Sequence, residues 1–293
     1  MVDGTEILLF HLLQFNQELA NITNSDVIIL RAPMVTGLDD IVKTQIENLK
    51  KNSPDIKKIS ILLETGGGFI EVVQRIYSVF RHHYELVDFI IPNFAYSAGT
   101  VLALSGDEIY MDYYSVLGPI DPQVSSENND LLPGIGYLLE YEALINKINN
   151  PKNPNSKAEM AFLLKKFDPA KLFYIKQARD HSIDLLKEWL PKHKFKDWKK
   201  HSSTGEDVTD EDRKERAEKI AGILGNPERW HSHGRGISID ELCGEEIKLK
   251  VVNFNKDANL NNAINQYYGL FIDLCGKLGS HGAIHTTLGM TRV

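Results

Sequence analysis

The first 112 residues of the chain alternate short apolar runs with stretches of helical periodicity. The apolar runs cover residues 27–30, 59–63 and 86–91, and their length is typical of buried strands. Apolar side chains with helical spacing predict helices that end at residue 51, span 70–83 and span 98–104, and residues 108–112 alternate as one more strand. Repeated strand–helix units predict an α/β sheet that binds ligands at the carboxyl ends of its strands.

A different pattern follows the polar break at residues 125–130. Helical periodicity dominates residues 133–149, 157–167 and 169–190, whereas strand signals are few. The highly charged stretch 191–215 is interpreted as a solvated loop that leads into a helix over 210–224. Ser238 and Glu241 form a capping-box pattern that begins another short helix.

These changes of pattern predict four parts of the chain. Residues 5–21 are apolar on much of a helical circumference, so the first part, 1–24, is an N-terminal helix that packs against the body or a partner. An α/β core follows over 25–128 and a helical subdomain with a histidine-bearing loop over 129–245. The last part, 246–293, is expected to contain a strand and a helix.

Composition and charge narrow the classes of function. The net charge of −7 and the scattered Lys and Arg residues argue against a nucleic-acid-binding protein. Cys243 and Cys275 lie far from any His/Cys cluster, so we expect no disulfide framework and no metal site. We also expect no cofactor. The apolar run at 7–10 is interrupted by His11 and lacks a basic segment before it, which predicts neither a signal peptide nor a membrane anchor. We therefore expect a cytoplasmic protein.

Two turns after predicted strands carry candidate chemistry. Glu64-Thr-Gly-Gly-Gly-Phe69 follows the second strand, and adjacent glycines let the backbone approach a ligand and aim N–H groups at it. Ser97 lies in Phe94-Ala-Tyr-Ser-Ala-Gly-Thr100, between an apolar run and a helix, which makes it the candidate nucleophile, although serine is also favoured there simply as a helix N-cap. A reactive serine needs a base and oxyanion donors from elsewhere in the chain.

Five segments together resemble the serine dehydrogenase proteinase family, relatives of the ClpP peptidases in the ClpP/crotonase superfamily. The resemblance covers roughly residues 25–245 and rests on Thr65-Gly-Gly-Gly68, Tyr96-Ser-Ala-Gly-Thr100, Asp107-Glu-Ile-Tyr-Met-Asp112, Leu117-Gly-Pro-Ile-Asp-Pro-Gln123 and Trp230-His-Ser-His-Gly-Arg-Gly-Ile237. It implies an α/β fold of the ClpP/crotonase type, a spiral of β-β-α units with an added helical subdomain. It also implies a serine peptidase that acts on peptides or unfolded protein segments and assembles as a homo-oligomer.

The same resemblance implies roles for particular residues. Ser97 matches the nucleophile, Asp121 is the best match for the acid and His233 for the histidine, in the chain order Ser, Asp, His. The backbone N–H groups of Gly68 and Ala98 match the oxyanion hole.

The neighbouring glycines complete the expected site. Gly67 and Gly99 are expected to line the substrate path. Relatives carry a proline before the glycine pair, where this chain has Gly66, and this departure loosens the turn that should hold an oxyanion donor. Many relatives also carry an N-terminal membrane segment, which this chain is not expected to have.

Several alternatives stay open from the sequence. Asp107 competes with Asp121 for the acid, and His231 competes with His233 for the base. A Ser-Lys dyad, as in signal peptide peptidases, would use Lys147 or Lys166, and a non-hydrolytic crotonase-like scaffold or interaction module would need none of these bases. The remaining histidines lie in polar surroundings and are expected at the surface, among them His82, His83, His193 and His201.

Overall fold

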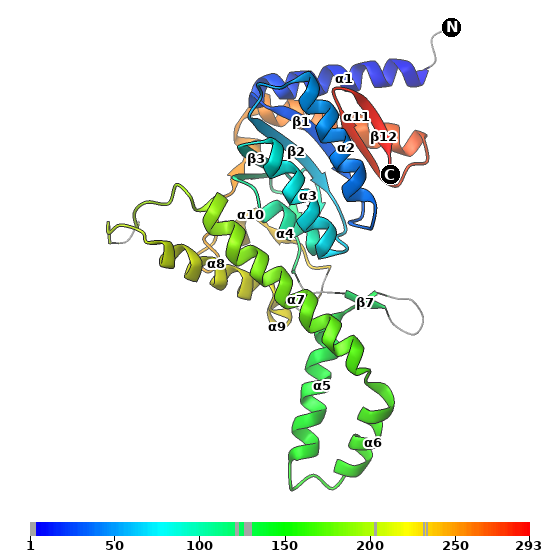
Figure 1. Cartoon of the computed structure of the whole chain (residues 1–293), viewed down its shortest axis with the longest axis vertical. Helices are drawn as coiled ribbons and strands as arrows, with labels where there is room; N and C mark the ends of the chain where they lie inside the picture. The colour runs from blue at the N-terminus through cyan, green and yellow to red at the C-terminus, as the bar shows by residue number, and fades with distance from the viewer. Residues whose placement is uncertain (1–3, 121–122, 126–130, 202–203, 231, 233) are drawn as a thin grey trace.

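The computed structural model describes residues 4–120, 123–125, 131–201, 204–230, 232 and 234–293 (Figure 1). Within them, seven strands form a central sheet in the order β10-β5-β3-β2-β1-β11-β12. The neighbours from β10 to β1 are parallel, and β11 and β12 add antiparallel strands at one edge. The strands are β1 (Asp26–Arg31), β2 (Lys58–Glu64), β3 (Leu86–Ile90), β5 (Glu108–Met111), β10 (Val252–Asn253), β11 (Ala283–Thr286) and β12 (Gly289–Arg292).

Helices cover both faces of this sheet. Both faces need cover because successive side chains of each buried strand point to opposite faces. In β1, Ile28 and Leu30 point to one apolar core, whereas Val27 and Ile29 point to another. The first core is closed by α2 (Leu38–Asn52), α3 (Ile70–His83) and α4 (Ala98–Leu104), and the second by α1 (Gly4–Thr23) and α11 (Ala258–Lys277). This α/β architecture confirms the fold class expected from the strand–helix pattern.

The helical part between residues 134 and 243 has two portions. One projects from the molecule as an arm, and the other packs against the helices of the α/β core. Helices α5 (Gly134–Asn149) and α6 (Ser156–Lys166) project away from the sheet with the first half of α7 (Pro169–Trp189), as Figure 1 shows in green. The second half of α7 packs on α3, where the Trp189 and Tyr77 rings stack with centroids 4.0 Å apart. Further elements are α8 (Asp210–Leu224), α9 (Pro227–Trp230), α10 (Ile239–Cys243) and a hairpin of β7 (Gln123–Ser125) and β8 (Leu131–Pro133).

The charged stretch after α7 differs from the solvated loop that its composition suggested. A π-helical turn, η1 (Leu190–Lys194), continues α7, and Phe195 is buried in the main core. The Lys194 side chain is only 2% exposed and pairs with Glu108. His193, expected at the surface, is half-buried and shares a 2.8 Å hydrogen bond with the Tyr77 hydroxyl. His193 and Lys194 therefore contact α3 and β5 rather than water, whereas Lys199 and Lys200 are exposed as expected.

The C-terminal segment closes the sheet. It contributes β10, the short helix η2 (Phe254–Lys256), α11, β11 and β12, of which the strands join both edges of the sheet. Helix α1 packs on α11, and Asn16 of α1 donates to the Tyr267 hydroxyl of α11 at 2.7 Å. Among the helices of the described ranges, none has both the length and the apolar character that a membrane crossing requires.

Buried His285 predicts a loss of stability in acid. Its Nδ1 lies 2.7 Å from the Tyr267 hydroxyl, and burial lowers the pKa of His285 to about 4. The unfolded chain therefore takes up the proton first, and stability that is complete above pH 6.5 is lost as the pH falls toward 4. We expect His285 to contribute about 3 kcal/mol to this loss.

Urea unfolding at pH 7 and pH 4.5 measures the effect. His193 has a pKa that burial likewise lowers to about 4, so the His285→Asn variant is compared with the unaltered chain to isolate His285. An equal pH dependence in both proteins would contradict the assignment.

Candidate active site

Ser97 lies on a tight turn between strand β4 (Phe94–Ala95) and helix α4. Its φ of 54° and ψ of −122° are values that side chains rarely adopt, and such strain costs on the order of 1–3 kcal/mol. Ser97 precedes the first residue of α4, yet its side chain makes no capping hydrogen bond. A serine kept only as a helix cap would use its hydroxyl for that bond, so the conformation favours a hydroxyl that is held free for another purpose.

The glycines after β2 lie directly against this turn. A Cβ atom built on Gly67 would lie 2.8 Å from Ser97 Cβ and 2.8 Å from the Tyr96 carbonyl oxygen. Gly67 has a φ of 96°, and its N–H donates to Thr65 Oγ1 at 3.0 Å. The site therefore has room for glycine alone at this position, since any side chain would collide with the serine turn.

The backbone around Met34 fixes the direction of Gly68. Met34 N donates to Gly67 O at 2.8 Å, and Phe69 N donates to Met34 O at 2.7 Å, which pairs Met34 with Gly68 in parallel. In a parallel pair the central residue turns its own N–H to the opposite side. That side carries the pairing of Thr65 with Ala95, two residues before Ser97. Gly68 N–H therefore points toward the serine side.

The N–H groups of Gly68 and Ala98 have no hydrogen-bond acceptor within the described part of the chain. Gly68 is exposed, and Ala98 begins α4, where a backbone N–H has no intrahelical partner. The N-terminal end of a helix also carries partial positive charge. Both groups are thus suited to bind a developing negative charge.

A small three-stranded sheet brings together the ends of three segments that are distant in sequence. Strand β6 (Val116–Leu117) pairs in parallel with β4, and β9 (Ile237–Ser238) pairs antiparallel with β6, so that Ala95, Leu117 and Ile237 lie in register. At this end of the small sheet, β4 leads into Ser97 and β6 leads toward residue 121. The chain runs from residue 233 into β9 at the same end. With strands about 4.8 Å apart, the three segments lie within about 10 Å of one another there.

The acid and base expected from the sequence, Asp121 and His233, lie outside the described residues, as does the competing His231. The residues that flank them are firmly held. Before Asp121, Ile120 is 3% exposed and its N–H donates to Leu224 O of α8 at 3.1 Å.

The histidine-bearing loop is held at both ends. Trp230, just before it, is 2% exposed and donates from Nε1 to Ile223 O at 2.8 Å. After the loop, Arg235 pairs with Glu241 at 3.1 Å.

Asp107, the competing acid, lies at the other end of the sheet. It precedes β5, whereas Ser97 follows β3 and β4, and these strands are parallel. Asp107 is 8% exposed and binds Arg81, Lys196 and the Val87 N–H. Burial alone would raise the pKa of Asp107, but these three partners lower it below its usual range. Its carboxylate is thus committed to a structural ion network.

The competing lysines lie on the arm. Lys147 is near the end of α5 and Lys166 ends α6, and both are exposed. A lysine base requires a buried site, and both of these side chains are exposed. No group of three or more His, Cys, Asp or Glu residues in the described ranges is arranged to hold a metal ion.

Two threonines have roles that the sequence motifs alone did not reveal. Thr100 Oγ1 donates to Ala95 O at 2.7 Å and lies 2.9 Å from both Gly118 N and Gly118 O, which ties α4 to the loop toward residue 121. Thr65 packs against buried Gly99, where a Cβ would lie 2.2 Å from Thr65 Cγ2. Both threonines belong to the sequence motifs at 65–68 and 96–100. Their position next to the glycines and the serine was the signal that could have identified these roles.

A comparison with known protein families identifies the family of this chain. Residues 30–213 match the sequence profile of the ClpP-like SDH-type serine proteinases, which is more than half of the chain. Two uncharacterised proteins of Methanocaldococcus jannaschii are 38% and 36% identical over 72 residues, a quarter of this chain and a quarter of each relative.

The solved structures that match this chain include a membrane-bound stomatin-specific protease, 1510-N. A lysine-to-alanine variant of it in complex with a substrate peptide is 15% identical, with a TM-score of 0.45 over 81% of this chain and 78% of that one. A serine-to-alanine variant is likewise 15% identical, with a TM-score of 0.45 over 82% and 83%. On the profile match, the chain belongs to the ClpP-like SDH-type serine proteinase family.

Proposed function

We propose that the chain hydrolyses peptide bonds through a triad of Ser97, Asp121 and His233. The observation that carries this proposal is the pairing of β4, β6 and β9 in the small sheet. It brings the segments that lead to Ser97, toward Asp121 and from His233 to the same end of these strands. Chain order alone would not require residues so far apart to meet.

In the proposed reaction Ser97 Oγ attacks the carbonyl carbon of a substrate peptide bond while His233 takes the hydroxyl proton. The tetrahedral intermediate collapses, the carbon–nitrogen bond breaks, and His233 returns the proton to the leaving amine. Water then hydrolyses the acyl-enzyme by the same route, which regenerates the Ser97 hydroxyl. Asp121 holds the imidazole in the required tautomer and stabilises the imidazolium.

The oxyanion would be bound by the N–H groups of Gly68 and Ala98. The direction of Gly68 N–H and the position of Ala98 at the start of α4 support this role. Such donors act on charge that develops only in the transition state. Gly67 and Gly99 would shape the substrate path beside them, Gly67 by leaving space next to Ser97 and Gly99 by packing α4 closely on Thr65.

The substrate class and assembly belong to the same proposal. We infer a peptide or an unfolded protein segment as the substrate, a homo-oligomer as the working form and the cytoplasm as its location. Light scattering of the purified full chain measures the oligomer, and a monomer at working concentration would overturn that part.

Labelling with a fluorophosphonate probe tests the base. We expect His233→Ala to slow labelling of Ser97 by about a thousand-fold, because the hydroxyl loses its general base. His231→Ala is the matched control in the same loop and should label at the unaltered rate.

The lysine variants complete the test. Lys147→Ala and Lys166→Ala should label normally, since both side chains lie exposed on the arm. Normal labelling of His233→Ala together with loss of labelling in a lysine variant would replace the triad by a Ser-Lys dyad.

A further inference from the structure

A cavity lies at the end of the sheet that is remote from Ser97. Its volume is about 780 Å³, within the range of sites that take small organic ligands. The walls come from the first residues of β2, β3 and β5, from residues 193–198 after α7, from α8 and from residues 248–250. Ser97 follows the carboxyl ends of the parallel strands, so this cavity is separate from the peptidase site.

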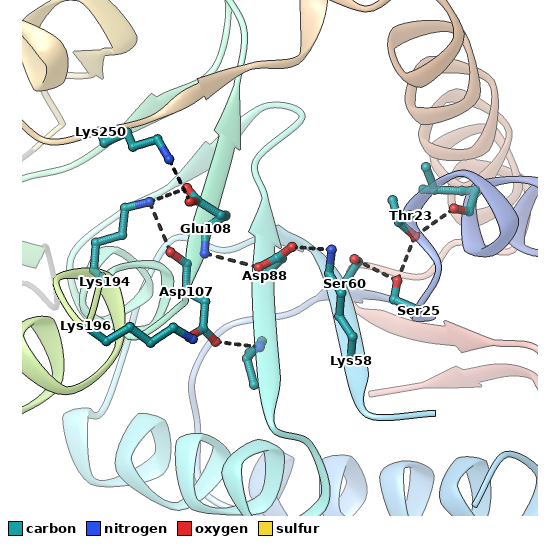
Figure 2. A network of polar contacts seen from close by, with 12 residues as sticks. Thr23, Ser25, Lys58, Ser60, Asp88, Asp107, Glu108, Lys194, Lys196 and Lys250 are labelled. Atoms are coloured by element: carbon teal, nitrogen blue, oxygen red, sulfur yellow. Dashed lines mark hydrogen bonds and ion pairs between the residues drawn. The ribbon is translucent and has the colours of Figure 1, made fainter. Parts of the chain in front are cut away.

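Three of the four carboxylates that line the cavity already have cationic partners, and the fourth, Asp197, is exposed. Glu108 accepts from Lys194 at 2.6 Å and Lys250 at 3.2 Å, as Figure 2 shows on the left. The other pairs are Asp88 with Lys58 at 2.8 Å, and Asp107 with Lys196 and with Arg81 at 2.7 Å. These acids are therefore neutralised by the chain itself and have little negative charge left to repel an anion.

Positive charge remains in excess after this pairing. The lining includes six Lys or Arg side chains, at positions 58, 194, 196, 216, 248 and 250, against four Asp or Glu side chains, at 88, 107, 108 and 197. The chain as a whole carries −7, so the local excess runs against the overall charge. Lys248 pairs with Glu245 outside the lining at 2.7 Å, but Arg81, also outside it, pairs with Asp107, so the positive charge stays in excess. Such an excess in a concave site attracts a multiply charged anion.

Arg216 is the cation whose charge is not balanced. Its guanidinium donates to the backbone oxygen of Ile247, and it has no carboxylate partner within the described residues. It is half-buried, and burial lowers the pKa of Arg216. Burial likewise lowers the pKa of Lys194, although Glu108 partly offsets it. A guanidinium in this position offers several N–H donors in one plane, the arrangement that binds phosphate oxygens.

The same cavity has an aromatic wall. Trp198, Phe195 and Tyr110 all contribute to the lining. Trp198 is held by a 3.1 Å hydrogen bond from Nε1 to Lys200 O and by an edge contact with Phe195, and it stays partly exposed. A fixed, partly exposed indole is a surface on which a planar ring can stack.

We propose that this cavity binds a nucleoside phosphate. The phosphate groups lie against Arg216 and the lysines around it, and the base stacks on Trp198. The phosphate groups of such a ligand neutralise the excess positive charge, and its planar base stacks on the aromatic wall. One molecule therefore accounts for both features of the cavity.

Isothermal titration of the full chain with adenosine diphosphate tests the proposal. We expect saturable binding that weakens at least ten-fold in Arg216→Gln and is unchanged in Lys219→Gln, an exposed position on the same helix outside the cavity. Trp198→Leu should weaken adenosine diphosphate but leave pyrophosphate unchanged, because pyrophosphate has no ring to stack. Binding should also weaken as salt rises.

Several results would overturn the proposal. Absence of saturable binding, equal affinity in Arg216→Gln and Lys219→Gln, or adenosine binding as tightly as its diphosphate would each do so. Succinate binding as tightly as adenosine diphosphate would assign the site to dicarboxylates instead.

Two controls separate this result from other effects. Unfolding midpoints without ligand control for folding, and Arg216→Lys, which keeps the charge, should bind better than Arg216→Gln. The Ser97→Ala variant should bind the ligand normally, so failure here and failure of the peptidase proposal are distinguishable.

Discussion

Peptidase activity of the Ser97→Ala variant is expected to fall by about a million-fold in kcat. The reason is that alanine cannot form the acyl-enzyme, while the donors at Gly68 and Ala98 would stay in place and leave only residual catalysis. Hydrolysis of an unfolded protein substrate, with fluorophosphonate labelling as a second readout, measures the loss. A variant that retains labelling would show that the probe reacts elsewhere and would remove Ser97 from its role.

A stability comparison at the same position separates chemistry from backbone strain. Alanine keeps the unfavourable φ of 54° at residue 97, whereas glycine adopts it readily. We therefore expect Ser97→Gly to be equally inactive but more stable than Ser97→Ala by about 1–2 kcal/mol in urea unfolding. Equal stability of the two variants would mean that the turn relaxes once the serine is gone.

The Gly68→Ala variant is expected to lose both stability and activity. A Cβ at Gly68 would lie 2.3 Å from the Met34 carbonyl oxygen, and the φ of 144° disfavours any side chain. The segment must then move away from Met34, which breaks two backbone hydrogen bonds and redirects the proposed oxyanion donor. We expect a loss of about 3 kcal/mol or more in unfolding free energy and at least a hundred-fold loss in kcat.

Gly66→Ala is the matched control two residues earlier. No atom lies within 4 Å of a Cβ built there, so alanine should be tolerated with activity close to that of the unaltered chain. Equal loss in Gly66→Ala and Gly68→Ala would show that the glycine turn as a whole, rather than its contact with Met34, is required. The hydrogen bonds around Met34 are formed in this chain, which has glycine at position 66.

Local patterns were sufficient for the elements that carry the nucleophile. Helical periodicity over 70–83 and 98–104 predicts α3 and α4 with the bounds that the structure has, and the apolar runs at 27–30, 59–63 and 86–91 became β1, β2 and β3. The capping box at Ser238 is confirmed, with Glu241 N donating to Ser238 Oγ at 3.3 Å. These features depend on neighbours in the chain, which a sequence displays directly.

Long-range pairing explains what the sequence could not predict. Lys194 is buried because Glu108, far earlier in the chain, accepts its hydrogen bond, and composition alone assigns such a lysine to the surface. The small sheet is equally hidden, since strands of two residues such as β4, β6 and β9 have no periodicity to detect. The roles of Asp121 and His233 stay predictions that rest on family resemblance and on the anchored residues beside them.

The register of β9 has a consequence during synthesis. Under the proposed triad, the nucleophile turn is complete once α4 has formed, but the base reaches it only after Ile237 and Ser238 have left the ribosome and paired with β6. The arm and α8 must be made in between. Under that proposal the serine stays inert while residues 98–238 are being made, so a nascent chain does not cleave neighbouring unfolded chains during this interval.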